Sequence, residues 1–236
     1  MTLKTTISET IGRNYESVQQ QIADACARAE CDSASVTLIA VVKYAQWEWV
    51  QALVAMGVTQ LGESRPQQLL QRSPLLGDEV SWHFIGHLQR NKIRKTLPVA
   101  GLIHSIDSLK LLRAVDRVAE ELNLTSRVLL QVNVSCEATK GGFAPEELRS
   151  SWDAVAECRH VEVCGLMTMA PESRDPGVAR TTFAGLRNLR DELIAAHEGL
   201  ALPELSMGMS GDLEIAIEEG ATMVRIGSGL FEGLEK

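Results

Sequence analysis

The chain has 236 residues, which fits one large domain or two small ones, and either arrangement can bury a hydrophobic core. Hydrophobic residues make up 45% and charged residues 23%, so disorder, collagen and coiled coil are excluded as descriptions of the whole chain. The net charge of −8 and the aromatic content of 4% argue against nucleic-acid binding, because an acidic surface repels phosphate backbones and bases need aromatic platforms for stacking.

The sequence also argues against a membrane or secreted protein. No apolar run reaches the roughly 18 residues of a membrane span, and the N-terminal stretch lacks the apolar centre of a signal peptide. The five cysteines are odd in number and form no CxxC pair, which argues against a disulfide framework or a structural zinc site. We therefore expect a cytoplasmic protein whose cysteines are reduced.

The spacing of apolar residues predicts the elements in chain order. Helical spacing predicts a leading amphipathic helix over 5–29. Short apolar runs predict strands at 36–42, 58–62, 81–86, 102–106, 127–133, 161–167, 204–209 and 222–227. Amphipathic segments between them predict helices at 46–56, 64–72, 89–96, 108–122, 145–158, 176–197 and 211–219. Ser108 and Pro145 are plausible helix starts, and Gly57 and Gly220 are plausible stops.

This alternation predicts an α/β fold with a parallel sheet. Eight strand–helix units of about 30 residues each fill the chain, and eight strands suffice to close a TIM-type (β/α)8 barrel. We expect residues 1–236 to form one domain, with a leading helical segment over 1–35 and the barrel over 36–232. A doubly wound open sheet is the competing fold.

Lys43 is the first candidate functional residue, because it ends the first predicted strand. In a barrel, the carboxyl ends of the strands form the mouth where ligands bind. An amine in that position can form a Schiff base with an aldehyde. The alternative is a solvated lysine at a strand end, since most lysines are exposed.

Two glycine-rich loops follow the last two predicted strands. Gly208 and Gly211 surround Ser210, and Gly227 and Gly229 surround Ser228. Glycines let backbone N–H groups approach a ligand closely, and barrels often bind phosphate in the loops after strands 7 and 8. Ordinary turn glycines are the alternative reading.

Closure of a barrel would bring the last strand beside the first, and so Lys43 beside the loop at Gly227. An amine next to a phosphate cradle suits pyridoxal 5′-phosphate (PLP), which carries an aldehyde and a phosphate. Arg225 lies two residues before Gly227, where its guanidinium could donate a hydrogen bond to a pyridine nitrogen. An ion pair with Glu63 or another carboxylate is the alternative for Arg225.

Other motifs are weaker. His83 and His87 have HxxxH spacing but straddle a strand end, so metal binding is disfavoured. The basic cluster Arg90, Lys92, Arg94 and Lys95 is most simply a solvated helix face, although it could dock an acidic partner.

Several segments together resemble a known family. They include IAVVK at 39–43, LGESRPQQ at 61–68, WHFIGHLQRNK at 82–92 and SMGMSGDLEIAIEEGATMVRIGSGLF at 206–231. On these motifs the chain resembles the pyridoxal phosphate homeostasis protein family, whose barrel is similar to that of alanine racemase, in the fold-type III group of PLP proteins. The resemblance covers about residues 36–232.

The resemblance implies the roles of individual residues. Lys43 would carry PLP as a Schiff base, Arg225 would face the pyridine nitrogen, and Ser210, Gly227 and Ser228 would hold the phosphate. The pocket would be lined by Ser64, His83, Asn133, Met167 and Ser206, with Ser64 standing where the family often has asparagine.

Two functions remain open at this point. One is a PLP-binding protein that buffers and delivers the cofactor and maintains vitamin B6 and amino-acid/keto-acid balance without a defined reaction. The alternative is an amino-acid racemase of the alanine racemase type. We favour the carrier, because the barrel leaves little chain for a second domain and the sequence offers no convincing second base beyond Tyr44. The expected partners are PLP and apo forms of PLP-dependent enzymes, and we expect a monomer.

Overall fold

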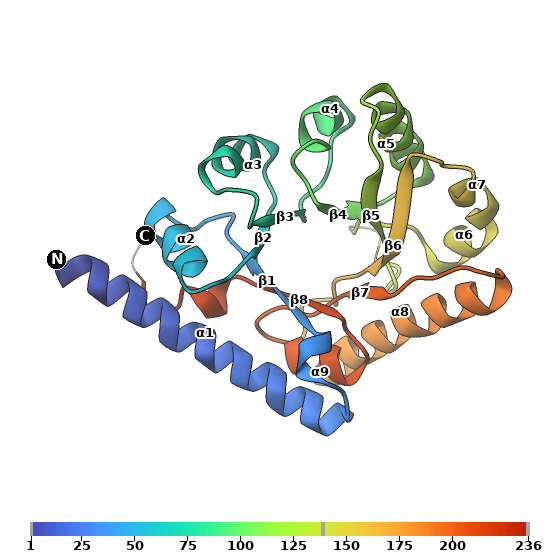
Figure 1. The fold of residues 1–236 in the computed structure, drawn as a ribbon. Helices are drawn as coiled ribbons and strands as arrows, with labels where there is room; N and C mark the ends of the chain where they lie inside the picture. The colour runs from blue at the N-terminus through green and yellow to red at the C-terminus, as the bar shows by residue number, and fades with distance from the viewer. Residues whose placement is uncertain (1, 138–139, 235–236) are drawn as a thin grey trace.

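Eight parallel strands form a closed barrel in the computed structural model, which describes residues 2–137 and 140–234 (Figure 1). The strands are β1 (Thr37–Val41), β2 (Gln60–Glu63), β3 (Ser81–Phe84), β4 (Leu102–Ile106), β5 (Ser126–Gln131), β6 (Val161–Met167), β7 (Glu204–Ser206) and β8 (Met223–Ile226). The barrel closes where β8 pairs with β1, with Thr37 opposite Met223 and Ala40 opposite Ile226. The predicted (β/α)8 fold is confirmed, and the open sheet is wrong because no strand is left at an edge.

The helices follow the strands and surround the barrel (Figure 1). They are α1 (Thr2–Ala29), α2 (Trp47–Ala55), α3 (Pro66–Arg72), α4 (Ile93–Thr96), α5 (Leu109–Glu121), α6 (Pro145–Ser150), α7 (Trp152–Ala156), α8 (Pro176–Ala196) and α9 (Leu213–Glu218). Short 3₁₀ turns lie at η1 (Ser33–Ser35), η2 (Ser73–Leu75), η3 (Arg90–Lys92) and η4 (Ser228–Leu230). Ser108 caps α5 with its side chain, Pro145 opens α6, and Gly57 and Gly220 follow helix ends with positive φ, as predicted.

Most predicted elements differ from the structure by a few terminal residues, and in two of them a local cause is clear. The helix expected over 145–158 is divided into α6 and α7 at Ser151, whose hydroxyl bonds back to the Glu147 carbonyl and competes with the helical pattern. The strand expected over 204–209 ends at Ser206. Gly208 then turns the chain with φ +92°, and a Cβ at this glycine would lie 2.6 Å from the Cβ of Ala216 in α9.

The core has two parts because successive strand residues face opposite sides of the sheet. Leu38 and Ala40 of β1 belong to the large cluster that packs against the surrounding helices. Ile39 between them faces the barrel interior. It belongs there to a smaller buried cluster formed by Ile39, Leu102, Leu129, Cys164, Met167 and Met223. All five cysteines are free thiols. Cys26 lies in the large cluster and Cys164 in the small one.

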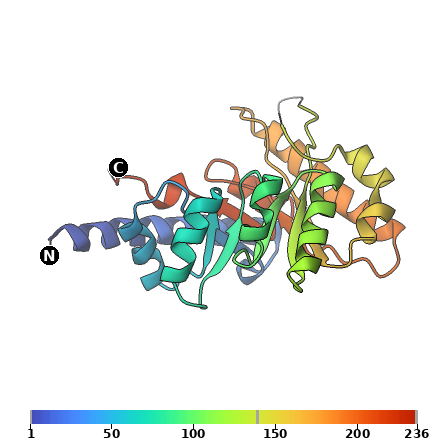
Figure 2. The ribbon, with the colours of Figure 1, turned by 90° about the horizontal axis from the view of Figure 1, so that it is seen from above.

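The long helix α1 spans the seam where the barrel closes. It packs against α2, α9 and η4, and Figure 2 shows it in dark blue on the same side as the red η4. The Asn14 amide of α1 donates to the carbonyls of Leu230 (3.1 Å) and Glu232 (2.9 Å). The N-terminal helix therefore holds the turn that follows the last strand. Within the described ranges, no helix has the length and apolar character that crossing a membrane requires.

Candidate functional site

The strand ends of β1 and β8 place Lys43 and the last glycine loop at one mouth of the barrel. The two strands run in parallel and pair up to Ala40 and Ile226, so the chain segments beyond them emerge side by side. A Cβ built on Gly227 would lie 3.4 Å from the Cβ of Val41. The adjacency predicted from barrel closure is therefore present. The Lys43 side chain is half-buried, and its Nζ lies 5.3 Å from the centre of the Tyr44 ring.

The backbone around Lys43 is held by a side chain from α3. Arg72 donates from Nη1 to the Val42 carbonyl and from Nη2 to the Ala45 carbonyl, both at 2.7 Å. These two carbonyls flank Lys43 and Tyr44 in the chain. Arg72 thus fixes the course of the segment from which the Lys43 side chain projects.

Arg72 is in turn held by Glu63, the last residue of β2. The Arg72 Nη1 lies 3.1 Å from Glu63 Oε2, and the carboxylate is fully buried. The other carboxylate oxygen accepts the backbone N–H groups of Ser64 (2.7 Å) and Arg65 (3.1 Å). Burial raises the pKa of Glu63, and the two N–H donors and the Arg72 charge oppose that rise. The ion pair between Glu63 and Arg225 that the sequence allowed is wrong, because Glu63 faces α3.

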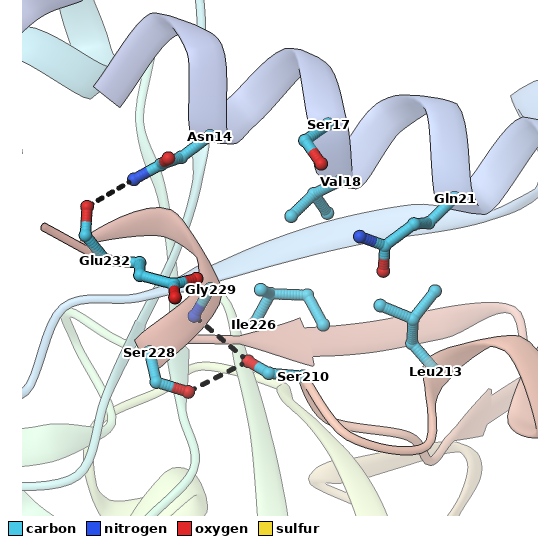
Figure 3. Close-up of a pocket in the computed structure, with 10 residues that line it drawn as sticks. All are labelled: Asn14, Ser17, Val18, Gln21, Ser210, Leu213, Ile226, Ser228, Gly229 and Glu232. Atoms are coloured by element: carbon cyan, nitrogen blue, oxygen red, sulfur yellow. Dashed lines mark hydrogen bonds between the residues drawn. The ribbon is translucent and has the colours of Figure 1, made fainter. Parts of the chain in front are cut away.

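Ser210, Ser228 and Gly229 come together where the two glycine loops meet. The Ser210 hydroxyl oxygen accepts hydrogen bonds from the Gly229 backbone N–H and from the Ser228 hydroxyl, both at 3.2 Å (Figure 3). Two hydroxyls and one backbone N–H of the two loops therefore lie together, at the place where the sequence predicts that a phosphate binds.

A cavity of about 520 Å³ between α1 and these loops reaches the same serines (Figure 3). The helix contributes polar side chains on the other wall, which include Asn14, Ser17 and Gln21. The cavity therefore adjoins Ser210 and Ser228 from the α1 side, and neither Lys43 nor Arg225 is among the residues that line it.

Arg225 of β8 points into the barrel interior and is almost fully buried. Its Nη1 donates to the Ser206 hydroxyl (2.6 Å) and its Nη2 to the Thr168 carbonyl (3.0 Å). Both partners are neutral, and no described carboxylate forms an ion pair with this guanidinium. Burial lowers the pKa of Arg225 to about 10, so it stays charged at neutral pH. A buried cation with neutral partners suits a polar ligand at the mouth.

Ser206 connects Arg225 to two buried histidines. Its Oγ lies 2.9 Å from His104 Nδ1, and His104 Nε2 lies 2.9 Å from His83 Nδ1. Burial lowers the pKa of His83 to about 4 and that of His104 well below its usual value. His83 therefore lies inside the barrel beneath Ser206. It reaches Arg225 only through His104 and Ser206. His104, which the sequence analysis missed, stands two residues from Leu102 and so on the same inward face of β4.

The other predicted pocket residues follow strand ends at the same mouth. Met167 ends β6 and is buried in the interior cluster. Ser64 follows β2 and donates its backbone N–H to Glu63. Asn133 follows β5, and its amide nitrogen bonds to the carbonyls of Glu137 (2.8 Å) and Lys140 (3.1 Å). Asn133 thus shapes its own loop. No cluster of three or more metal-ligating side chains occurs among the residues described.

Comparison with known proteins identifies the family. The family model described as "Alanine racemase, N-terminal domain" matches residues 13–235. A pyridoxal phosphate homeostasis protein of Aquifex aeolicus is 41% identical over 91% of this chain and 94% of its own length. The chain belongs to the pyridoxal phosphate homeostasis protein family.

Solved structures agree with this assignment. A Bifidobacterium adolescentis protein titled as unknown has a TM-score of 0.87 at 35% identity, over 96% of both chains. The Synechococcus elongatus family member PipY, solved with PLP bound, has a TM-score of 0.78 at 35% identity and covers 89% of this chain and 99% of PipY. Similarity to alanine racemase of Clostridium difficile is 13% in sequence and shows the fold alone. The family and the barrel fold that the sequence predicts are both confirmed.

Replacing Arg72 by alanine is expected to lower the free energy of unfolding by about 3–5 kcal/mol, because the buried Glu63 carboxylate loses the cation that faces it. Urea denaturation followed by circular dichroism measures the change. The control is Arg94→Ala, whose partner Glu121 is exposed, and it should cost about 1 kcal/mol or less. The double variant Glu63→Gln with Arg72→Ala should recover part of the loss. A cost for Arg72→Ala equal to that of the control would contradict the pairing.

The lowered histidine pKa values predict how stability depends on pH. Above the ordinary histidine pKa of 6.5, His83 is neutral in folded and unfolded chains. As pH falls from 6.5 toward about 4, the unfolded chain binds a proton that the folded chain refuses, so stability falls. His83 alone should remove about 3 kcal/mol across that range.

Glu63 acts in the opposite direction because its pKa is raised, so the measured quantity is the difference between wild type and His83→Gln. Urea midpoints at several pH values give the two profiles. The wild-type profile should fall more steeply toward acid than that of His83→Gln, and parallel profiles would show that folding leaves the His83 pKa unchanged.

Proposed function

We propose that this protein binds PLP through Lys43 and acts as a carrier that buffers and delivers the cofactor, maintaining vitamin B6 and amino-acid/keto-acid balance. Membership of the homeostasis family and the PLP-bound structure of PipY support this function. The observation that carries it is the closure of β8 against β1, which puts an amine, a hydroxyl cradle and a buried guanidinium at one mouth. PLP supplies an aldehyde that condenses with an amine and a ring that withdraws electrons.

The residues present fit such a group. A phosphate needs donors, and the loops bring two hydroxyls and the Gly229 N–H together. Gly227 lies against Val41 and places no side chain between its own backbone and the mouth. In this proposal Ser210, Gly227 and Ser228 hold the phosphate, and Lys43 offers the amine for the Schiff base.

Arg225 orients the ring in this proposal. Its guanidinium keeps its proton, so it donates a hydrogen bond to the ring nitrogen and disfavours protonation of that nitrogen. An unprotonated ring withdraws electrons less strongly, which suits storage better than catalysis. Ser64, Asn133, Met167 and Ser206 shape the pocket from the ends of four other strands, and His83 supports Ser206 from below.

A racemase is the second candidate, and Tyr44 is the residue that would serve it. Racemisation needs acid–base groups on both faces of the substrate. Tyr44 is 58% exposed, and its ring lies against Lys43 Nζ and, at 5.1 Å, against the Arg65 guanidinium. A ring that is mostly exposed to solvent is poorly placed to act as the second base of an enclosed site. This supports the carrier.

The five free thiols support a reducing compartment, and we place the protein in the cytoplasm. Its partners in this proposal are PLP and apo forms of PLP-dependent enzymes, and it acts as a monomer.

The first test is the covalent attachment. Protein incubated with PLP should show a visible absorbance band, and borohydride should fix the label on the peptide that contains Lys43. Lys43→Ala should lose both band and label while its circular dichroism stays unchanged, because the side chain is half-buried and its replacement leaves the core intact.

Lys95→Ala is the matched control, since Lys95 is exposed on α4, and it should label like wild type. Ser228→Ala should still label but should release unreduced PLP faster on dialysis. Label on another lysine, or an unchanged band in Lys43→Ala, would refute the assignment of Lys43.

The second test separates carrier from racemase. The loaded protein should restore activity to an apo PLP-dependent enzyme, with transfer faster than from a borohydride-reduced control. With alanine and other amino acids in D₂O, exchange of the Cα proton should stay far below ordinary enzyme rates of about 1 s⁻¹ or more. Exchange at such rates, measured by proton NMR, would make the racemase the correct function.

A further inference from the structure

A chain of hydrogen bonds runs through the barrel from Gln60, at the start of β2, to Arg225, near the end of β8. Gln60 Oε1 lies 2.8 Å from His83 Nε2, and the histidines and Ser206 continue the chain to Arg225 through the contacts given above. Each of the two histidines uses both ring nitrogens in this chain. The barrel interior thus holds a polar path among apolar side chains.

One direction of the protons satisfies every group, starting from the Arg225 end. A guanidinium only donates, so the Ser206 oxygen accepts from Arg225. The one hydroxyl proton of Ser206 then serves His104 Nδ1, which accepts. A neutral His104 carries its proton on Nε2 and donates to His83 Nδ1, which leaves the His83 proton on Nε2.

The Gln60 end requires the same direction. Its carbonyl oxygen only accepts, so His83 Nε2 must donate to it. Each bond therefore has one donor and one acceptor, and both histidines are neutral Nε2–H tautomers. A neutral His83 with its proton on Nδ1 would leave no proton between its Nε2 and the Gln60 oxygen, and a neutral His104 with its proton on Nδ1 would leave none between the two rings. The lowered pKa values of both histidines agree with this arrangement.

We propose that His104, braced by His83, is a positioning residue that directs the Ser206 lone pair at Arg225 and so holds the guanidinium in place for a bound pyridine ring. This rests on the proposed binding of PLP. Arg225 has Ser206 and the Thr168 carbonyl as its bonded partners, and only Ser206 can turn. Without an acceptor at His104, the hydroxyl proton is free to rotate toward the guanidinium, which repels it.

The first measurement needs no cofactor. Nitrogen-15 NMR of histidine-labelled protein at neutral pH should show His83 and His104 as neutral Nε2–H tautomers, assigned with His83→Gln and His104→Asn. An Nδ1–H tautomer or an imidazolium at either residue overturns the proposal. This result is independent of whether PLP binds.

The second measurement compares His104→Leu with His104→Asn. Leucine removes the acceptor for Ser206, whereas the asparagine side-chain oxygen lies near the position of Nδ1 and restores it. His104→Leu should bind PLP about tenfold more weakly, the effect of losing one hydrogen bond that supports a charged group. The asparagine variant should recover most of the affinity.

A role confined to packing is tested by a spectroscopic signature. With PLP labelled at the ring nitrogen, the nitrogen-15 shift should move in His104→Leu and return in His104→Asn. The control His160→Leu replaces a histidine at the barrel surface and should leave affinity and shift unchanged.

If the wild-type protein forms no adduct at Lys43, the proposed function fails. The tautomer measurement still decides where the protons of His83 and His104 lie. If wild type binds PLP and folded His104→Leu binds it equally with an unchanged nitrogen shift, the positioning role is wrong.

Discussion

The pairing of β8 with β1 is the constraint on which the site depends. Thr37 and Met223 lie 186 residues apart in the chain, yet they stand opposite each other in the sheet. In an open sheet the two strands would form separate edges, and Lys43 would be far from Ser228. Such a distant pairing is costly in chain entropy, and α1 offsets part of that cost by packing against α9 and tying η4 through Asn14.

Closure also decides what the interior can hold. The inner cluster around Ile39 and Met223 is apolar, but His83, His104, Ser206 and Arg225 share the same enclosed space, and the partly exposed Gln60 ends their hydrogen-bond series. Unpaired polar groups there would be strongly destabilising. These buried polar groups are tolerated because each hydrogen-bond donor faces an acceptor. The series of hydrogen bonds runs in one direction and ends at the Arg225 guanidinium. Stability and the orientation of Arg225 thus share one set of hydrogen bonds.

Patterns local in the chain predicted most of the fold and part of the site. Runs such as VTLIAVV mark buried strands, and the position of Lys43 after one of them needs no tertiary information. His104 and Arg72 were missed because their partners come from other strands or helices, and the register between neighbouring strands decides which side chains meet. The signal for His104 was its two-residue spacing from Leu102, which puts an ionisable ring on an inward face.

The surface charge and the cradle fit a carrier. The chain has a net charge of −8, so no broad positive field draws a phosphate in or holds it at the mouth. The groups that meet at Ser210, Ser228 and Gly229 are neutral, and the buried guanidinium among the predicted site residues is that of Arg225. Hydrogen bonds from neutral donors are weaker than those from charged ones. In the proposed function, a few directed hydrogen bonds and one covalent link to Lys43 retain the ligand, and exchange of that link releases it for delivery to another protein.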